Sequence, residues 1–174
     1  IGKSAIIAQK IVATLNSTGT PSIFLHAAEA IHGDLGMIQN GDVVLCISKS
    51  GNSPEIKVLA PIIKNFGTTL IGMTANPTSF LATSSDLILH AHVDAECCPL
   101  GLAPTNSTTA QLVLGDAIAV CLMKLRDFQA EDFAKYHPGG ALGKKLLLRV
   151  KDMLDQTHAP QVSPNASIKK VIME

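Results

Sequence analysis

The chain has 174 residues, with 14 basic and 14 acidic side chains, a hydrophobic share of 47% and an aromatic share of 3%. This length accommodates one full domain with its own core and is too short for two domains of ordinary size. The balanced charge and the scarcity of aromatic rings argue against a disordered chain and against binding to nucleic acid or a membrane surface, so we expect a small neutral or anionic metabolite as partner.

Short β-branched runs alternate with longer segments of helical periodicity, which is typical of an α/β fold with helices on both faces of a parallel sheet. Helices are expected in chain order at residues 5–16, 27–35, 53–66, between 77 and 86, at 107–126 and 130–135, and after the glycine-rich turn at 136–143. Strands are expected at residues 22–25, 42–47, 69–73 and 86–90.

The composition changes near residue 151, beyond which Pro160 and Pro164 precede an isolated helical stretch at residues 166–173. We therefore predict one domain at residues 1–150, followed at residues 151–174 by a linker and the start of a further module.

The four cysteines show no CxxC spacing, which indicates reduced thiols in a cytoplasmic protein. They are Cys46, Cys97, Cys98 and Cys121. No apolar run approaches the roughly 18 residues needed to span a bilayer, and the first residues show no secretory pattern. We expect a cytoplasmic protein.

The apolar strand at residues 42–47 runs directly into a serine-rich loop that opens the next helix. Ligands of open parallel sheets bind beyond the carboxyl ends of the strands, where the following helix offers unpaired N–H groups. The hydroxyls of Ser48, Ser50 and Ser53 add donors, and Gly51 lets the backbone approach a ligand closely. This pattern predicts a phosphate site, although a plain turn with an N-cap remains an alternative.

Two further segments can contribute to the same site. The loop at residues 104–109 also enters a long helix and can close the other side of a phosphate, although Ser107 is equally suited to cap that helix. The Gly2-Lys3-Ser4 run matches the end of a nucleotide P-loop, but no upstream glycine is visible. A lysine that stabilises a sugar oxyanion is favoured over nucleotide binding.

Five side chains are candidates for acid–base chemistry, each with an ordinary structural alternative: Glu55, Glu96, His26, His32 and His137. Glu55 falls in the first turn of a helix, where a carboxylate is also favourable for structural reasons. Glu96 follows a strand in a loop, and His137 precedes a constrained Pro-Gly-Gly turn.

These motifs make the chain similar to the sugar isomerase (SIS) family over about residues 1–153. The shared segments are GKS at Gly2, STGTPS at Ser17, EAIHGDLGM at Glu29, ISKSGNSPE at Ile47, ECCPLGLAPTNSTTA at Glu96, GDAIAV at Gly115 and EDFAKYHPGGALGKKLLLRV at Glu131. The resemblance implies a three-layer αβα sandwich with a doubly wound, mostly parallel, five-stranded sheet. It is strongest to the branch that interconverts D-ribulose 5-phosphate and D-arabinose 5-phosphate to supply 3-deoxy-D-manno-octulosonate for lipopolysaccharide.

The resemblance also implies roles for individual residues. The catalytic set would be Lys3, Glu55, Glu96 and His137. Glu96 is favoured as the base, His137 as the group that opens the sugar ring and Lys3 as the partner of the enediolate oxygen. The substrate-binding set would be Gly2, Ser4, Gly19, Thr20, His26, His32, Ser48, Lys49, Ser50, Gly51, Ser53, Thr105, Ser107 and Thr108. His32 matches a position that binds inhibitory zinc in relatives, and no cofactor is needed for turnover.

The resemblance further implies a homotetramer, a paired regulatory module of the cystathionine β-synthase type from about Asp152 onward, and a nucleotide sugar as feedback ligand. Lys49 is a departure, because relatives usually read Ser-Asn-Ser-Gly-Glu-Ser where this chain reads Ser-Lys-Ser-Gly-Asn-Ser. SIS domains also serve as noncatalytic sugar-phosphate sensors, and that alternative stays open.

Overall fold

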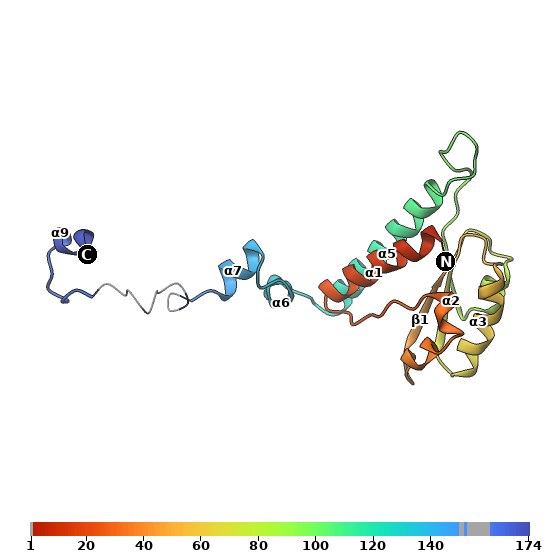
Figure 1. Cartoon of the computed structure of the whole chain (residues 1–174), viewed down its shortest axis with the longest axis horizontal. Coiled ribbons are helices and arrows are strands. Elements are labelled where there is room, and N and C mark those ends of the chain that lie inside the picture. Colours follow the sequence, from red (N-terminus) through yellow and green to blue (C-terminus); the bar gives the residue numbers. More distant parts are fainter. Residues whose placement is uncertain (1, 150–151, 153–160) are drawn as a thin grey trace. The chain divides into compact units, whose positions relative to one another are not determined.

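The computed structural model of the chain describes residues 2–149, 152 and 161–174. It divides into two compact units, of which the first ends at Gln129 and the second begins at Ala130 (Figure 1). The predicted domain boundary at residues 150 and 151 lies outside the described residues.

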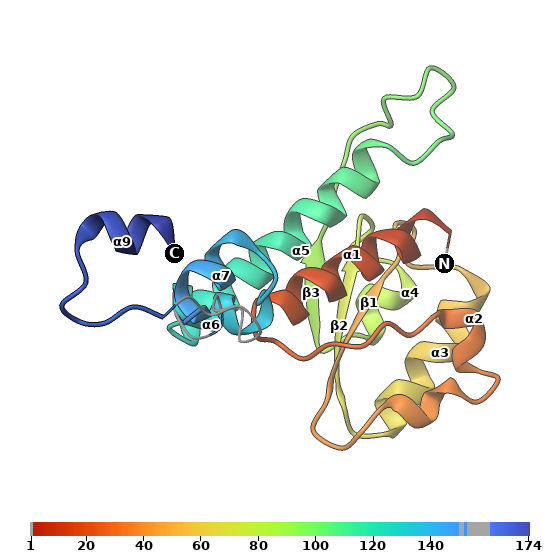
Figure 2. The same cartoon turned by 60° about the vertical axis from the view of Figure 1, so that its left-hand side comes forward.

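A parallel sheet forms the centre of the first unit. Its strands are β1 (Val43–Ile47), β2 (Thr69–Thr74) and β3 (Leu87–His90), and they lie in this order (Figure 2). All three match expected strands, and they confirm the α/β class.

The expected strand at residues 22–25 is not formed, and the sheet of the described residues has three strands where five were expected. The side chain of Asn16 explains part of this difference. Asn16 Nδ2 donates to the carbonyl of Ser22 at 3.0 Å, and Asn16 Oδ1 accepts from the Ser22 N–H at 2.7 Å. Both backbone groups of Ser22 are therefore occupied and cannot join a strand ladder.

Helices cover both faces of the sheet. Side chains alternate along a strand, so Val44 and Cys46 of β1 face one side while Leu45 and Ile47 face the other. The first side packs against α2 (Ala27–Ala30), α3 (Pro54–Asn65) and α4 (Phe80–Ser84), with the 3₁₀ helix η1 (Asp34–Met37) alongside. The second side packs against α1 (Lys3–Ser17) and α5 (Asn106–Leu125). The three-layer arrangement is confirmed.

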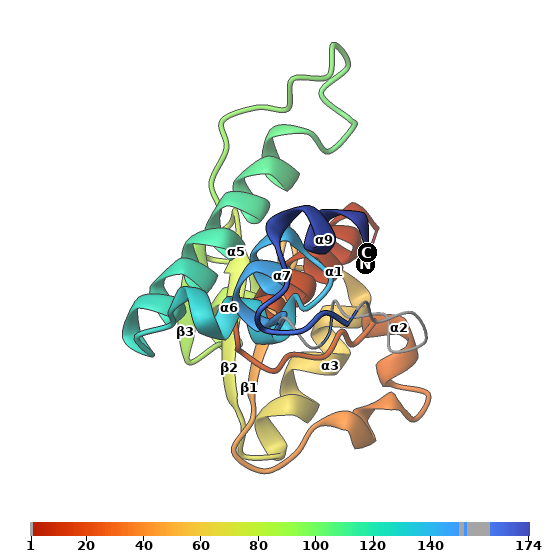
Figure 3. The ribbon, with the colours of Figure 1, turned by 90° about the vertical axis from the view of Figure 1, so that its left-hand side faces the viewer.

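Helix α5 packs along α1 (Figure 3). The two helices approach closely at Gly115 and Ile11. A Cβ atom on Gly115 would lie 2.3 Å from Ile11 Cγ1, so only glycine allows this approach. The buried residues of α5 recur every fourth position, at Ser107, Gln111, Gly115 and Ala119. The outward face exposes Val113 and Val120.

By its 20-residue length and its composition, α5 also passes the test for a membrane-crossing helix, contrary to the expectation that no segment approaches that criterion. Core helices of globular proteins pass the same test when they are mostly buried, whereas 17% of the apolar window of α5 is buried, on the face that packs against α1. This feature alone is weak evidence for a membrane segment.

The described residues of the second unit include the short helices α6 (Ala130–Tyr136), α7 (Ala141–Leu147) and α9 (Ile168–Met173). The turn between α6 and α7 holds His137, as expected from the glycine-rich sequence. All four cysteines are free thiols. Burial raises the pKa of the Cys46 thiol to about 12, which makes it unreactive.

Candidate functional site

The serine loop follows β1 and leads into α3. Ser48 Oγ accepts from the Gly51 N–H at 3.1 Å, and Ser50 Oγ accepts from the Asn52 N–H at 3.3 Å. Gly51 has a φ of +65°, and a Cβ atom there would lie 2.2 Å from Ser79 Oγ. Both the conformation and the available space therefore require glycine at this position.

A cavity of about 350 Å³ opens at the carboxyl end of β1. It is lined by the start of α1, the serine loop and the start of α5. The predicted site residues among its lining are Gly2, Lys3, Ser4, Ser48, Lys49, Ser50, Ser53 and Ser107. Three segments far apart in the sequence thus meet where a parallel sheet binds ligands.

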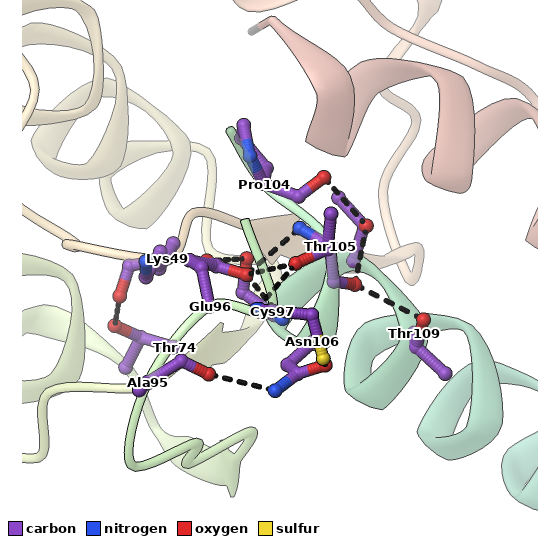
Figure 4. Close-up of polar contacts among 11 residues, drawn as sticks. Lys49, Thr74, Ala95, Glu96, Cys97, Pro104, Thr105, Asn106 and Thr109 are labelled. Atoms are coloured by element: carbon purple, nitrogen blue, oxygen red, sulfur yellow. Dashed lines mark hydrogen bonds and ion pairs between the residues drawn. The ribbon is translucent and has the colours of Figure 1, made fainter. Parts of the chain in front are cut away.

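Glu96 is the most constrained side chain beside this cavity, with 2% of its side chain exposed. Its Oε1 accepts from Lys49 Nζ at 2.5 Å and from Ser107 Oγ at 2.5 Å. Its Oε2 accepts from the N–H groups of Thr105 at 2.7 Å and Ser107 at 3.2 Å, and from Thr105 Oγ1 at 3.2 Å. Figure 4 shows Glu96 held between Lys49 and the start of α5.

These contacts fix the charge of Glu96. The Lys49 ammonium first, then the Ser107 hydroxyl and the Thr105 N–H, hold the pKa of this carboxyl well below its usual range. Glu96 is therefore an anion throughout the physiological pH range, and it satisfies N–H groups at the positive end of the α5 dipole. A carboxylate held in this way is a weak proton acceptor.

The hydroxyls of the loop at residues 104–109, the threonine loop, mostly bond to other groups of the protein. Thr105 Oγ1 accepts from the Cys97 N–H at 2.9 Å, and Thr108 Oγ1 donates to the Thr105 carbonyl at 2.9 Å. Asn106 Nδ2 donates to the Ala95 carbonyl at 2.8 Å. Of the three predicted hydroxyl groups in this loop, the one of Ser107 borders the cavity, and it donates to Glu96.

Three of the four predicted catalytic residues, Glu55, Glu96 and His137, lie outside the lining of this cavity. Glu96 contacts two lining residues, Lys49 and Ser107. Glu55 is half-buried in the first turn of α3, next to the serine loop. His137 belongs to the second unit, where its ring stacks on Phe133 with centroids 3.8 Å apart and its Nδ1 lies 2.9 Å from the Phe133 carbonyl oxygen.

The predicted sugar contacts Gly19, Thr20, His26 and His32 are not among the residues that line this cavity. Gly19 and Thr20 follow the end of α1, and 15 helical residues separate them from Lys3 by about 22 Å. Arg126 donates to the Gly19 carbonyl at 2.8 Å and to Thr20 Oγ1 at 3.0 Å. Thr20 and His26 instead border a larger cavity of about 810 Å³ that shares Ser4, Ile47 and Ile56 with the first.

His32 is exposed in the turn between α2 and η1. Among residues 2–149, 152 and 161–174, no three His, Cys, Asp or Glu side chains gather in a way that could hold a metal ion. Zinc binding at His32 stays a prediction.

The pairing of Lys49 with Glu96 was not foreseen from the sequence. The two residues are 47 positions apart, and no motif joins them. Glu96 precedes the Thr-Asn-Ser-Thr run at the start of α5. An acidic residue ahead of a helix start is the sequence feature from which an anchoring role could have been predicted.

Comparison with known proteins decides the family. The model of the SIS domain matches residues 1–121. The chain belongs to the SIS domain family. Its α/β fold is the SIS fold, which positions the serine loop and the starts of α1 and α5 around one cavity.

Individual SIS relatives are similar over much of the chain. The arabinose 5-phosphate isomerase KdsD of Pseudomonas aeruginosa is 55% identical over all of this chain and 54% of its own length. The KdsD of Escherichia coli K12 is 53% identical over all of this chain and 53% of its own length. The chain thus spans about half the length of these curated relatives.

A solved structure described as Escherichia coli CFT073 c3406 in complex with A5P is 50% identical and has a TM-score of 0.76. The match covers 79% of this chain and 73% of that chain.

Proposed function

We propose that the chain carries the catalytic domain of an aldose–ketose isomerase that interconverts D-ribulose 5-phosphate and D-arabinose 5-phosphate. The observation that carries this proposal is the cavity that joins Lys3, the serine loop and Ser107, with Glu96 anchored beside it. The names of the two KdsD relatives and the A5P complex of c3406 support the same substrate.

In the proposed mechanism the phosphate group binds the serine loop, where hydroxyls and the N-terminus of the 12-residue helix α3 favour an anion. A glutamate removes the proton from C2 of the open aldose and returns it to C1. A second proton passes from the oxygen on C2 to the oxygen on C1, so that C2 becomes the carbonyl carbon. Lys3 stabilises the enediolate oxygen, and His137 helps to open the furanose ring.

Glu96 is the proposed base, with Glu55 as the other candidate. Isomerisation in D₂O tests this assignment, because an enediolate step places solvent deuterium on the carbon that receives the proton. We expect Glu96→Gln to lower deuterium incorporation at least about 100-fold, the usual loss for a missing acid–base group. Incorporation at the parental rate in Glu96→Gln, with loss in Glu55→Gln, would instead assign the role to Glu55.

Several finer features complete the proposal. We propose a soluble, cytoplasmic homotetramer that supplies 3-deoxy-D-manno-octulosonate for lipopolysaccharide and that responds to a nucleotide sugar. We also propose that residues 1–150 act as the SIS domain, with residues 151–174 as linker and start of a regulatory module. The remaining predicted contacts, Gly19, Thr20, His26 and His32, would reach substrate in a site completed by another copy.

A further inference from the structure

Lys49 lies between the carboxylate of Glu96 and the predicted phosphate site in the cavity. Its ammonium pairs with Glu96 Oε1 at 2.5 Å, and the same side chain lines the cavity together with Ser48 and Ser50. The two partners differ in accessibility, because 46% of the Lys49 side chain is exposed and 2% of that of Glu96. Lys49 can therefore reorient toward the cavity while Glu96 remains in place.

The backbone of Lys49 is held firmly. Its carbonyl accepts from Thr74 Oγ1 at 3.0 Å (Figure 4). It also accepts from the Ala75 N–H at 3.0 Å. Any change of partner must therefore occur through the four-carbon stem of the side chain, whose terminal ammonium is a compact, mobile point charge.

The remaining partners of Glu96 cannot substitute for this charge. Thr105 and Ser107 of the α5 start contribute neutral N–H and hydroxyl donors. Among the described contacts of Glu96, Lys49 supplies the cationic one, from the opposite side. Lys3 also lines the cavity, but no described contact joins it to Glu96.

We propose that Lys49 is a positioning residue shared between Glu96 and the phosphate group of a bound substrate, so that phosphate binding withdraws the ammonium from Glu96 Oε1. Phosphate carries up to two negative charges and competes with the single charge of the carboxylate for one cation. Ser107 Oγ then remains the partner of Oε1 and keeps the carboxylate in position.

The catalytic meaning of this exchange rests on the proposed function, in which Glu96 is the base. Once the ammonium is withdrawn, the largest cause of the low pKa of Glu96 is removed, and the pKa of Glu96 rises toward its ordinary range. Glu96 becomes a stronger base while a phosphorylated compound is bound. The chain would thus restrict proton abstraction to substrates that carry the phosphate group.

The direct test measures the affinity of inorganic phosphate for the 174-residue chain by calorimetry at pH 8. Four proteins form a cycle: the parent, Lys49→Met, Glu96→Gln and the double variant. If Glu96 and phosphate compete for Lys49, introducing Glu96→Gln into the parent should tighten phosphate binding about five- to tenfold, a typical coupling between two sites. In the Lys49→Met background, the same substitution changes the affinity less than about twofold.

Lys57→Met is the matched control, because it removes the same charge from an exposed position on α3 outside the cavity lining. In that background Glu96→Gln should tighten phosphate binding as much as in the parent. Equal tightening with and without Lys49 would overturn the proposal, since simple repulsion between Glu96 and phosphate would then explain the effect.

A second measurement keeps the test decisive if Glu96→Gln does not fold. The carboxyl ¹³C resonance of Glu96, assigned by through-bond correlation, is titrated in the parent and in Lys49→Met with and without phosphate. Phosphate should raise the pKa of Glu96 in the parent by more than in Lys49→Met. An equal rise in both proteins, or none in the parent, would contradict the exchange.

Turnover separates this inference from the proposed function. Lys49→Met should raise KM for the sugar phosphate about tenfold, and Lys49→Arg should restore most of it, whereas a purely structural role would change stability instead. Coupling in the phosphate cycle without any isomerase activity would support the role of Lys49 and reject the isomerase proposal. Isomerase activity without coupling would support the isomerase proposal and reject the role of Lys49.

Discussion

Glu96 was singled out from the sequence as an acid–base candidate, and the structure adds that it is an anchor for the start of α5. Its carboxylate is bound by donors from Lys49, Thr105 and Ser107. The sequence indicated a polar loop ahead of a helix, but it could not indicate which donors converge on one carboxylate, because that depends on how the loop after β3 folds back.

The hydroxyl of Ser107 should contribute measurably to stability. Ser107→Ala removes the 2.5 Å bond to Glu96 Oε1 from a side chain that is 1% exposed, and we expect a loss of about 1–3 kcal/mol. Urea unfolding at pH 7 measures this loss. Thr109→Ala is the control, since it removes an exposed hydroxyl from the same turn of α5 and should cost less than about 0.5 kcal/mol. Equal losses in the two variants would contradict the anchoring role.

The low pKa of Glu96 predicts how stability depends on pH. A carboxyl whose pKa is lower in the folded state stabilises the fold above its usual pKa of 4.5, and this contribution is lost as the pH falls toward the folded-state pKa. The free energy of unfolding should therefore decrease from pH 5 to pH 3. Urea titrations across this range should show a flatter decrease in Glu96→Gln, and an unchanged slope in the exposed control Asp34→Asn. A slope in Glu96→Gln equal to that of the parent would contradict the prediction.

Among the secondary structure elements, those with strong patterns agree with the sequence prediction. The apolar run before the serine loop is β1, and Ser53-Pro54 opens α3 as expected for an N-cap followed by proline. The strand expected at residues 22–25 failed because a side chain outside it, that of Asn16, takes both backbone groups of Ser22. Local β propensity carries no information about such a competitor.

The contact between α1 and α5 predicts an unusual outcome for a glycine-to-alanine change in a helix. Alanine normally stabilises a helix by about 1 kcal/mol relative to glycine. In Gly115→Ala, however, the new Cβ meets Ile11 at 2.3 Å, so we expect a net loss of about 1–3 kcal/mol.

Thermal and urea unfolding test this prediction in a double-mutant cycle with Ile11→Ala, where the combined loss should be smaller than the sum of the single losses. Gly36→Ala is the control, because no atom lies within 4 Å of its added Cβ. Additive losses at Gly115 and Ile11 would contradict the close packing.

At the scale of the whole molecule, the α/β class and the three layers could be predicted from composition and periodicity, whereas the complete site could not. Lys3 and the serine loop meet because the starts of α1 and α3 lie at the same end of the sheet. Gly19 and Thr20 lie at the far end of α1, whereas His26 lines the larger cavity, which shares Ser4, Ile47 and Ile56 with the smaller one.

The length of α1 between Lys3 and the predicted contacts Gly19 and Thr20 supports the proposed tetramer, as does the exposed aliphatic face of α5 with Val113 and Val120. Light scattering should give four times the 18.3 kDa mass of one chain. A single-chain mass in an active sample would contradict the shared site.

Isomerase activity is the central claim, and one assay tests it most directly. The purified 174-residue chain is mixed with arabinose 5-phosphate, and ribulose 5-phosphate is measured over time, with Lys3→Met as the control variant. We predict steady formation of ribulose 5-phosphate, reduced at least about 100-fold in Lys3→Met while its fold is retained. A folded chain that binds arabinose 5-phosphate but forms no ribulose 5-phosphate would contradict the account and identify a noncatalytic sugar-phosphate sensor.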